Sequence, residues 1–593
     1  MYLSRSRIIH VLFITSMIVF LARLFFIQVL STEYGAVAEK NMVQRIEQYP
    51  CRGNIYDRNQ QLLVTNHPLY DLWVLPNAVQ DIDIAAFCRT FTISEAGFQQ
   101  RLKKARQFSA IRPSVFIRNI DHYTLARLQE QLIDYPGFYI KARTVRHYCY
   151  PSLANTLGYL GEISPKQLAS SQYHGYKQSD FIGVSGLEAQ YEGWLSGRRG
   201  LQYKIVDAKG NEKGPFKQGE LDVRCEPGKD LVLSIDIDLQ VYGEWLLANK
   251  KGSIVAIEPA TGHILAIVSS PSYDPNRLTQ QAIKQHFTAL EKDPDCPLFH
   301  RPIMAMYPPG SIFKLVQALI GLQEQVIVPR KQCACNKKVV NCHAHPSPVN
   351  LHQAIQYSCN PYFYHVFRAI INQKVVTDAY ADTCIGLQKW TRYVKGFGLG
   401  APLGIDLPYE KGGYVPDTHL YDTQYGVGRW QHSTIRSLDI GQGEILITPL
   451  QMANLAAIMA NRGFYYQPHL STTQDTDVQK YVVDIDEAHF TLIVHAMRAV
   501  VTNGSGGRAQ VKGITVCGKT GTVENLHGKD HAVFMGFAPL EKPQIAIAVY
   551  VENAGWGARA AAAIAGLMIE KYLKRVVTRK GMEAYVLKGD FDD

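Results

Sequence analysis

Two side chains in the middle of the chain are spaced so that they could carry out acyl transfer. Ser311 and Lys314 follow the irregular stretch Tyr307–Gly310, and the apolar residues after them predict a helix that begins at the serine. Residues three positions apart share one face of a helix, so the lysine amine could take the proton of the serine hydroxyl. A lysine serves as a base only where burial or a second cation lowers its pKa. Alone, such a pair is more often a helix cap or a packing contact, so the chemistry depends on what else the chain supplies.

Two further motifs make that chemistry specific. Ser358-Cys359-Asn360 follows 47 residues after Ser311, and Lys519-Thr520-Gly521-Thr522 follows another 161 residues later. The first motif is predicted on a helix, the second on a loop before a helix and the third on a β-strand. Ser-x-x-Lys, Ser-x-Asn and Lys-Thr-Gly in this order are typical of penicillin-binding proteins and class A β-lactamases.

The sequence around the motifs predicts an α+β domain that positions them. Residues 253–276 contain two β-rich runs joined by the turn Pro259–Gly262, which is the pattern of a hairpin. A long Ala- and Leu-rich helical region follows. The end of the domain returns to β-rich sequence and closes with a helix at 561–576. We therefore expect an antiparallel sheet assembled from both ends of the domain, with helices packed against it.

The N-terminal part resembles the pedestal of the class B penicillin-binding proteins. Five segments carry the resemblance, and they extend it over nearly the whole chain: Arg52–Asn59, Gly158–Glu162, Gly186–Glu188, Gly441–Glu444 and Thr448–Ala453. Residues 69–75 alternate like a half-buried strand, and 98–108 and 123–132 are helix-forming, so this part is expected to be mixed α and β. The Tyr-Pro-Pro-Gly-Ser-Ile-Phe-Lys motif and the long pedestal are most similar to penicillin-binding protein 2, the elongation transpeptidase.

The resemblance implies a division of the chain into five parts. They are a cytoplasmic tail at 1–7, a transmembrane helix at 8–30, a non-catalytic pedestal (dimerisation-type) domain at 45–230, a transpeptidase (penicillin-binding) domain at 231–575 that is similar to serine β-lactamases, and a C-terminal tail at 576–593.

One segment is apolar enough to cross a membrane. Ile8–Leu30 has 23 mostly apolar residues, and a helix of that length measures about 34 Å. Arg5 and Arg7 precede it, so the positive-inside rule places the N-terminus in the cytoplasm and the rest of the chain in the periplasm of a bacterial inner membrane. A cleaved signal peptide is the alternative, although its apolar run is usually shorter. Arg23, inside the span, would face a partner helix or snorkel to the interface.

The composition fits a folded, multi-domain protein. The chain is 46% hydrophobic and 19% charged, with a formal net charge of +10 over 593 residues. Disorder and a multi-pass membrane protein are excluded, and so mild a basic bias does not by itself indicate a nucleic-acid partner.

The resemblance implies a peptidoglycan D,D-transpeptidase that acts through an acyl-enzyme. Ser311 would attack the carbonyl between the two terminal D-alanines of a stem peptide, and Lys314 would accept its proton. Lys519 would keep Lys314 partly neutral by repulsion between like charges. Ser358 would relay the proton to the leaving amine, and Asn360 would hold Lys314 and the substrate amide.

The Lys-Thr-Gly strand would bind the rest of the peptide. Thr520 and Thr522 would bind the terminal carboxylate that penicillins mimic, and the strand edge would pair with the extended peptide, with Gly521 between them. The backbone N–H groups of Ser311 and Thr522 would form the oxyanion hole.

Other functions remain open at this point. A D,D-carboxypeptidase differs only in passing the acyl group to water, a β-lactam sensor or β-lactamase would share the motifs, and a non-enzymatic cell-wall scaffold could retain the fold. The resemblance implies three kinds of partner: β-lactams as inhibitors, other elongation-complex proteins, and a multi-pass glycan polymerase of the shape, elongation, division and sporulation family. The chemistry needs no cofactor.

A cluster of cysteines predicts one structural zinc ion. Cys335, Cys342, His345 and Cys359 are separated by 6, 2 and 13 residues, with Cys333 as an alternative first ligand. Three thiolates and an imidazole form a closed tetrahedral set. A disulfide, for example between Cys335 and Cys342, is the competing interpretation in an oxidising compartment, and free thiols are a third.

Overall fold

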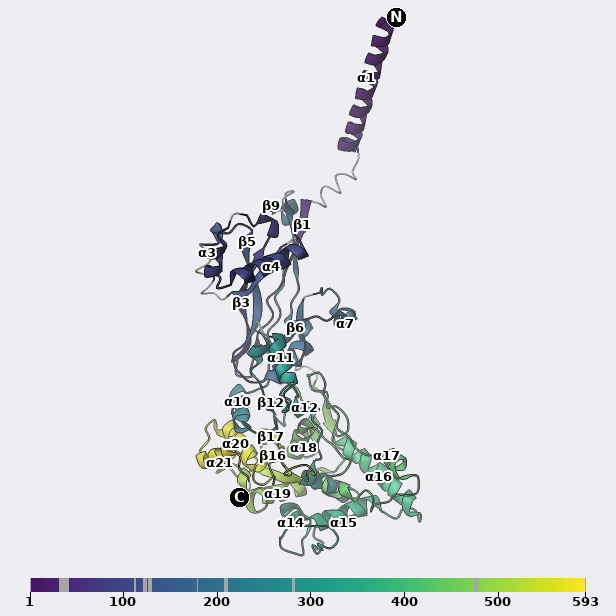
Figure 1. Cartoon of the computed structure of the whole chain (residues 1–593). Coiled ribbons are helices and arrows are strands. Elements are labelled where there is room, and N and C mark those ends of the chain that lie inside the picture. The colour runs from purple at the N-terminus through teal and green to yellow at the C-terminus, as the bar shows by residue number, and fades with distance from the viewer. Residues whose placement is uncertain are drawn as a thin grey trace. The chain divides into compact units, whose positions relative to one another are not determined.

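The computed structural model describes residues 2–30, 42–80, 82–110, 113–120, 125, 131–178, 180–206, 212–279, 283–473 and 478–591. The chain forms two compact units (Figure 1). The first contains residues 1–53 and 193–229, and the second contains 54–192 and 230–593. The second unit therefore combines most of the segment predicted as a pedestal with the predicted catalytic domain.

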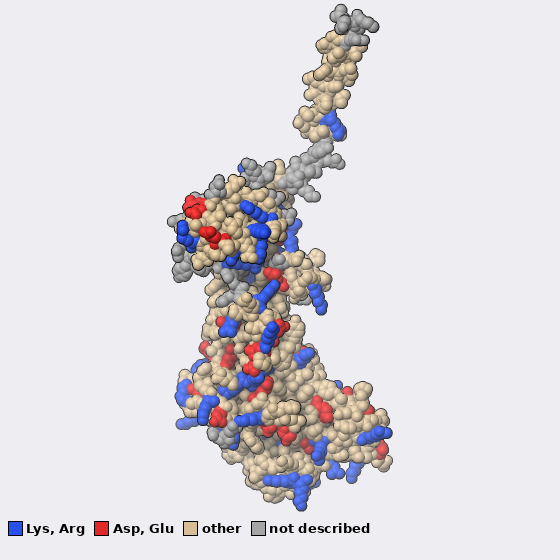
Figure 2. Space-filling view, in the orientation of Figure 1, with Lys and Arg blue, Asp and Glu red and all other residues tan. Residues whose placement is uncertain are grey.

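The first unit contains the predicted apolar helix. Helix α1 runs over Tyr2–Phe25 and continues as a π-helical turn at Phe26–Leu30. Within it, Ser6–Gln28 has a mean hydropathy of 2.3 and is long and apolar enough to cross a membrane. Most of this helix has no charged side chains on its surface in Figure 2. The same unit holds an antiparallel sheet in the order β1 (Val43–Gln48), β8 (Gly200–Val206) and β9 (Glu212–Pro215).

The second unit begins with a five-stranded sheet. Its order is β10 (Leu231–Val232), β2 (Ile55–Tyr56), β3 (Leu62–Val74) and β4 (Ser114–Ile120), and β5 (Phe138–Tyr148) also pairs with β3. The strand expected at 69–75 is thus the second half of β3. Helices α3 (Ile84–Thr90) and α4 (Glu95–Phe108) cover it over an aromatic core around Phe87. The helix expected at 123–132 lies mostly outside the described residues.

The pedestal motifs have structural roles. The buried Asp57 carboxylate accepts hydrogen bonds from the backbone N–H groups of Asn59 and Gln61 at 2.8 and 2.7 Å. Arg146 and Glu188 form a buried ion pair at 2.7 Å. A buried pair of this kind is costly to break, because the remaining charge would be left without a partner. These motifs therefore hold the scaffold together rather than perform chemistry.

The central sheet of the second unit confirms the predicted α+β domain. Its five antiparallel strands have the order β12 (Ile264–Ser270), β11 (Gly252–Ile257), β17 (Ile545–Val551), β16 (His531–Ala538) and β15 (Cys517–Val523). The sheet is assembled from both ends of the domain, as expected, and the hairpin β11–β12 encloses the predicted turn. Strand β15, which carries the Lys-Thr-Gly motif, lies at the edge.

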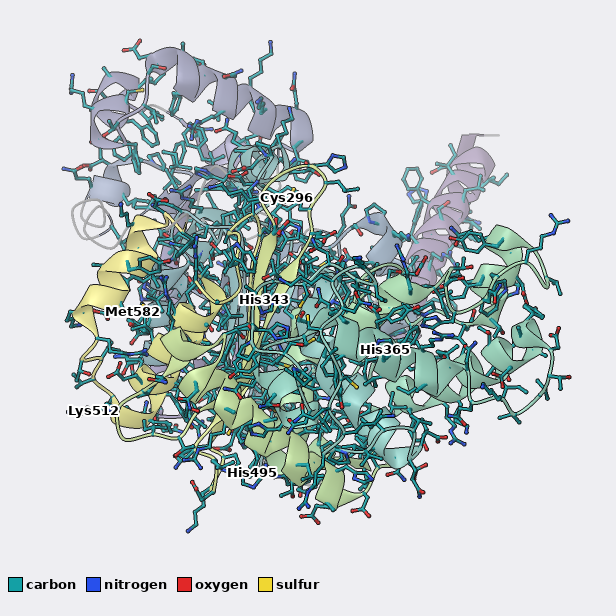
Figure 3. All side chains as sticks on the ribbon, turned by 90° about the horizontal axis from the view of Figure 1, so that it is seen from below. Cys296, His343, His365, His495, Lys512 and Met582 are labelled. Carbon is teal, nitrogen blue, oxygen red and sulfur yellow. The ribbon has the colours of Figure 1, made fainter. Side chains whose placement is uncertain are left out.

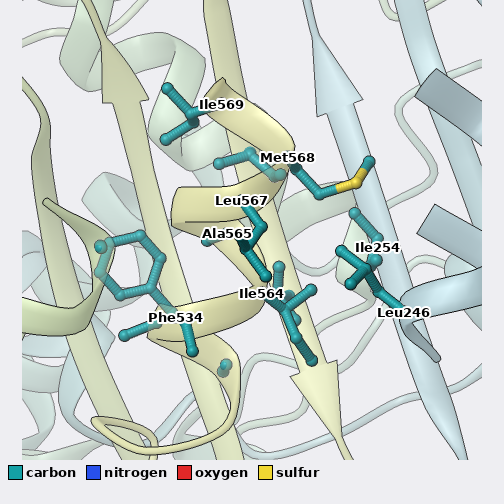
Figure 4. Packing of buried hydrophobic residues seen from close by; sticks show 14 of the residues in the cluster. Leu246, Ile254, Phe534, Ile564, Ala565, Leu567, Met568 and Ile569 are labelled. Atoms are coloured by element: carbon teal, nitrogen blue, oxygen red, sulfur yellow. The ribbon is translucent and has the colours of Figure 1, made fainter. Parts of the chain in front are cut away.

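Helices cover both faces of this sheet. Helices α10 (Ile237–Leu246) and α20 (Ala561–Lys574) pack on one face, where Ile564, Leu567 and Met568 lie over the strands (Figure 4). Helix α18 (Pro449–Asn461) packs on the other face. Each fully buried large aliphatic side chain contributes roughly 1.5–3 kcal/mol, so the sheet is a rigid base for the edge strand.

The remaining helices complete the fold. In chain order they are α6 (Ala154–Leu157), α7 (Pro165–Leu168), α8 (Gly186–Gln190), α9 (Glu192–Leu195), α11 (Ile283–Glu291), α12 (Arg301–Met304), α13 (Lys314–Gln323), α14 (Leu351–Gln356), α15 (Asn360–Ile371), α16 (Ala379–Gly396), α17 (Thr418–Tyr425), α19 (Glu487–Asn503) and α21 (Lys580–Lys588). Two short strands, β6 (Leu160–Glu162) and β7 (Phe181–Gly183), pair with each other, as do β13 (Phe464–Tyr466) and β14 (Lys480–Val482).

Candidate active site

Ser311 lies in a 3₁₀ turn that leads into α13. The turn covers Gly310–Phe313, and α13 begins at Lys314. Gly310 has a φ of +60°, and a Cβ there would lie 3.1 Å from the Thr522 carbonyl oxygen. Only a residue without a side chain allows so close an approach in this left-handed conformation. The turn therefore places Ser311, which is partly exposed, against the edge strand β15.

Lys314 is the centre of a buried hydrogen-bond network. Its Nζ donates to the Ser358 carbonyl oxygen at 2.9 Å, to Ser358 Oγ at 3.2 Å and to Asn360 Oδ1 at 2.5 Å. The side chain is fully buried. Ser311 is not among these acceptors: it lies in the 3₁₀ turn just before Lys314, and the lysine amine is held by the Ser-x-Asn motif.

The backbone conformation of the Ser-x-Asn motif allows both Ser358 and Asn360 to reach Lys314. Ser358 follows α14 and has a φ of +57°, which is uncommon for a serine. Cys359 then caps α15, which begins at Asn360. The left-handed residue reverses the chain, so Ser358 Oγ and Asn360 Oδ1 meet the same amine.

Strand β15 brings the third motif to the same network. Lys519 is fully buried, and its Nζ donates to Ser358 Oγ at 2.8 Å and to the Thr520 carbonyl oxygen at 3.0 Å. Ser358 Oγ thus lies between two lysine amines. Further along the strand, Thr522 Oγ1 accepts from the Gly557 N–H at 3.3 Å and remains partly exposed. Gly521 is buried between these two residues.

The two lysines differ in electrostatics. Burial lowers the pKa of Lys314 to about 8. Burial, and then the charge of Lys314, lowers the pKa of Lys519 well below its ordinary value. The sequence predicted that Lys519 would lower the pKa of Lys314. In the structure burial is the main cause for both lysines, and the charge of Lys314 lowers the pKa of Lys519 further.

One further hydroxyl group belongs to the site, and the sequence did not predict it. Ser505 Oγ lies 2.6 Å from Thr520 Oγ1. Ser505 belongs to the segment Asn503–Gly507, between α19 and β15. The glycine-rich turn shortly before the Lys-Thr-Gly strand was the sequence feature that could have indicated a role for Ser505. Its distance along the chain from the strand does not show which strand residue the serine contacts.

The predicted metal ligands also come together. One ligand atom from each of Cys335, Cys342, His345 and Cys359 lies within 4.8 Å of every other. They lie on the loop that holds His343, labelled in Figure 3, and at the start of α15. Cys333 is not part of the group. In tetrahedral zinc sites with bonds of about 2.0–2.3 Å the ligand atoms lie roughly 3.5 Å apart, so a small closure would complete the set.

The electrostatics of the cluster suit a thiolate ligand. Hydrogen bonding from Cys359 holds the pKa of Cys342 well below its ordinary value, whereas burial raises the pKa of Cys335 and the hydrogen bond to Cys342 raises that of Cys359, so one thiolate is favoured. All eleven cysteines are free in the structure, so the disulfide interpretation has no counterpart among them. The loop is tied to the catalytic motif, since Asn360 Nδ2 donates to the Asn341 carbonyl oxygen at 2.7 Å.

Comparison with known proteins assigns the family. The family model for the penicillin binding protein transpeptidase domain matches residues 252–570, and that for the penicillin-binding protein dimerisation domain matches 47–233. The chain is 30% identical over 578 residues to the peptidoglycan D,D-transpeptidase MrdA of Acinetobacter baumannii, covering 89% of this chain and 81% of that protein. The chain belongs to the class B penicillin-binding proteins of the penicillin-binding protein 2 type.

Solved structures agree on the fold. The penicillin-binding protein PBP2 of Helicobacter pylori, solved in complex with MreC, matches with a TM-score of 0.74 at 24% identity and covers 90% of this chain and 99% of that one. A chain of a peptidoglycan synthase complex that coordinates polymerization and crosslinking matches with a TM-score of 0.72 at 24% identity, over 97% and 99% of the two chains.

These findings confirm the predicted family, the fold class and the serine acyl-transfer type of enzyme. The zinc prediction gains no support from them and rests on the ligand cluster alone.

Proposed function

We propose that this protein cross-links peptidoglycan stem peptides through a Ser311 acyl-enzyme during cell-wall elongation. The observation that carries the assignment of residues is the chain of hydrogen bonds from Lys314 through Ser358 to Lys519. Ser311 attacks the carbonyl between the terminal D-alanines, and its proton passes to Lys314. Ser358 then relays a proton to the departing D-alanine amine, which has to leave uncharged. A β-lactam acylates the same serine.

The edge strand binds the end of the donor peptide in this proposal. Thr520, Thr522 and the adjacent Ser505 present hydroxyl groups to the terminal carboxylate. The N–H groups of Ser311 and Thr522, from elements in close contact at Gly310, hold the oxyanion. The Asn360 side chain binds the substrate amide through the hydrogen-bonding positions that Lys314 and Asn341 leave unused.

We propose a membrane arrangement on the basis of α1. Its apolar length supports a single anchor, with Arg7 on the cytoplasmic side and the pedestal (45–230) and catalytic domain (231–575) in the periplasm. An enzyme held at the membrane can meet glycan strands as a polymerase produces them. We propose such a multi-pass polymerase, together with other elongation proteins, as partners. The matching structures of a complex with MreC and of a synthase complex support this.

One experiment tests activity and partnership together. The full-length protein is purified in detergent with its polymerase and supplied with lipid-linked precursor. We expect cross-linked dimers of stem peptides, and uncross-linked strands when Ser311→Ala replaces the wild type. Release of D-alanine without dimers would instead assign a carboxypeptidase.

The partnership has its own control. Replacing residues 1–45 with an unrelated membrane anchor should weaken copurification with the polymerase and disturb cell shape. Failure of the wild type to copurify, together with normal shape in the anchor-swapped strain, would contradict it.

We also propose that Cys335, Cys342, His345 and Cys359 hold one structural zinc ion. The bound metal would supply order to a loop with few apolar side chains and would steady Ser358 and Asn360, which flank Cys359. No step of the acyl transfer passes through it.

Metal content and variants test this site. We expect about one equivalent of zinc in the purified protein, falling below about half in Cys335→Ser and Cys342→Ser. Cys333→Ser is the matched control, because Cys333 lies in the same loop but outside the cluster, and its zinc content should equal that of the wild type. Wild-type protein with less than about half an equivalent, and a disulfide among these cysteines in a thiol titration, would exclude the site.

A further inference from the structure

The chain that leads into the nucleophile is anchored by Tyr307, a residue that the proposed reaction does not use. Only Pro308, Pro309 and Gly310 lie between Tyr307 and Ser311. Each proline ring fixes the φ angle of its residue, so two consecutive prolines make this connection stiff. A shift of Tyr307 is therefore passed on to Ser311.

The hydroxyl group of Tyr307 is held by a carboxylate that follows strand β17. Tyr307 Oη donates to Glu552 Oε1 at 2.6 Å, and Arg301 Nε donates to the same oxygen at 3.2 Å. Arg301 is buried, and its two terminal nitrogens donate to the carbonyl oxygens of Asp295 and Cys296 at 2.9 and 3.3 Å. The charged and fixed guanidinium group keeps the Glu552 carboxylate in place, so this carboxylate is a fixed acceptor for the tyrosine.

The ring and the backbone of Tyr307 are held as well. The ring stacks on that of Tyr550 from β17, with centroids 3.9 Å apart and planes 14° from parallel. The Tyr307 N–H donates to the Ile447 carbonyl oxygen at 2.9 Å, and the Ile447 N–H donates back at 2.8 Å. Stacked rings can still slide past each other in their planes. The hydrogen bond to Glu552 prevents this, because it fixes the far end of the ring.

The other end of the connection meets the edge strand that carries the Lys-Thr-Gly motif. The Gly310 N–H donates to the Gly441 carbonyl oxygen at 2.8 Å, and a Cβ on Gly310 would lie 3.1 Å from the Thr522 carbonyl oxygen. Ser311 and Thr522 supply the two N–H groups of the proposed oxyanion hole. The alignment of these two groups depends on where the connection places Ser311 along β15.

We propose that Glu552 and Tyr307 are positioning residues for acylation. By holding the Tyr307 hydroxyl group, the Glu552 carboxylate fixes the Pro-Pro-Gly connection, and the connection in turn fixes Ser311 opposite Thr522. This rests on the proposed role of Ser311 as the nucleophile. In the step that they support, Ser311 Oγ bonds to the substrate carbonyl carbon, the carbonyl π electrons move to its oxygen, and the hydroxyl proton moves to Lys314 Nζ. Neither positioning residue exchanges a proton in this step.

A positioning role determines which kinetic constant changes. Noncovalent binding of a penicillin uses groups that the connection does not carry, whereas bond formation needs Ser311 Oγ in line with the carbonyl carbon. Misplacement of reacting groups by about 1 Å costs on the order of 10²-fold in rate. The ring stack on Tyr550 and the backbone bonds to Ile447 remain when the Tyr307 hydroxyl group is lost, so the shift and its cost should be smaller.

Acylation of a Tyr307→Phe variant tests the proposal. The full-length protein in detergent is mixed with a fluorescent penicillin at increasing concentrations, and the labelling of Ser311 gives a limiting rate and a half-saturating concentration. Phenylalanine keeps the ring stack and loses only the hydrogen bond to Glu552. We expect the limiting rate to fall about tenfold. The half-saturating concentration should stay within about twofold of the wild-type value.

Substitutions of Glu552 show whether the hydrogen bond is the cause. Glu552→Gln keeps an oxygen that accepts from Tyr307, so its limiting rate should stay within about twofold of the wild-type rate. Glu552→Ala should slow acylation as Tyr307→Phe does. The double variant Tyr307→Phe/Glu552→Ala should be no slower than either single variant, because both remove the same bond.

Tyr242→Phe is the matched control. Tyr242 is likewise half-buried and donates to a carboxylate, Glu583 Oε1, at 2.8 Å, but it lies on α10, which packs against the opposite edge strand β12. This variant loses an equivalent hydrogen bond and should label at the wild-type rate.

Several results would overturn the proposal. They are unfolding of Tyr307→Phe, a wild-type limiting rate in that variant, a rise in its half-saturating concentration in place of the lower rate, or an equal loss of rate in Tyr242→Phe. If Glu552→Ala does not fold, the comparison of Tyr307→Phe with Glu552→Gln decides, and equal losses in these two would also contradict the proposal. Absence of labelling in the wild type would instead contradict the proposed function.

Discussion

Replacing Ser311 with alanine should abolish covalent labelling of this protein by a fluorescent penicillin. The acyl-enzyme bond forms at Ser311 Oγ, and without that atom the site can bind a β-lactam only reversibly. The change removes one oxygen from a partly exposed residue, so it should not impair folding. The measurement is fluorescence of the denatured full-length protein on a gel, which reports the covalent product alone.

Two variants make this result specific. Ser433→Ala alters an exposed serine of the same domain and should label like the wild type. Ser311→Cys places a thiol at the nucleophile position and should retain measurable labelling. Labelling of Ser311→Ala at the wild-type level, or none in the wild type, would contradict the assignment of the nucleophile.

The sequence predicted the parts of this site that are defined by short-range patterns. The three motifs lie on a helix start, a loop and an edge strand, as predicted from the irregular Pro-Pro-Gly stretch before Ser311, the helical sequence after Asn360 and the β-rich sequence around Lys519. The antiparallel sheet could be anticipated because its strands are apolar runs with turns between them. The grouping of Cys335, Cys342, His345 and Cys359 could be anticipated from their spacing.

Other features depend on tertiary packing that spacing does not encode. Ser505 meets Thr520 because the turn after α19 brings its hydroxyl group back to strand β15. Burial lowers the pKa of both lysines, and only the fold brings Lys519 close enough to Lys314 for the charge of Lys314 to lower its pKa further. Ser358 adopts its left-handed backbone conformation because of the way α14 and α15 pack, and its residue type does not predict that conformation.

Removing the amine of Lys314 should have the second largest effect. A positioned general base typically contributes 10²–10⁴-fold, so Lys314→Gln should lower the rate of Ser311 acylation by about that factor. Glutamine can still donate to the Ser358 carbonyl oxygen or Asn360 Oδ1, so the loop should keep its place. The rate is measured with the same fluorescent penicillin under conditions in which binding is saturated.

The pH profile separates loss of the base from loss of structure. Burial lowers the pKa of Lys314 to about 8, and only the neutral amine can accept a proton. The wild-type rate should therefore fall as the pH drops through about 8, since more of the lysine is then protonated, and Lys314→Gln should lose this dependence along with most of its rate. Lys389→Gln is the control: it removes an amine that pairs with Glu324 at 2.6 Å in the same domain. This variant should retain both the wild-type rate and its pH dependence. A Lys314→Gln variant with a wild-type rate would move the role of base to Lys519, the other buried amine that reaches Ser358 Oγ.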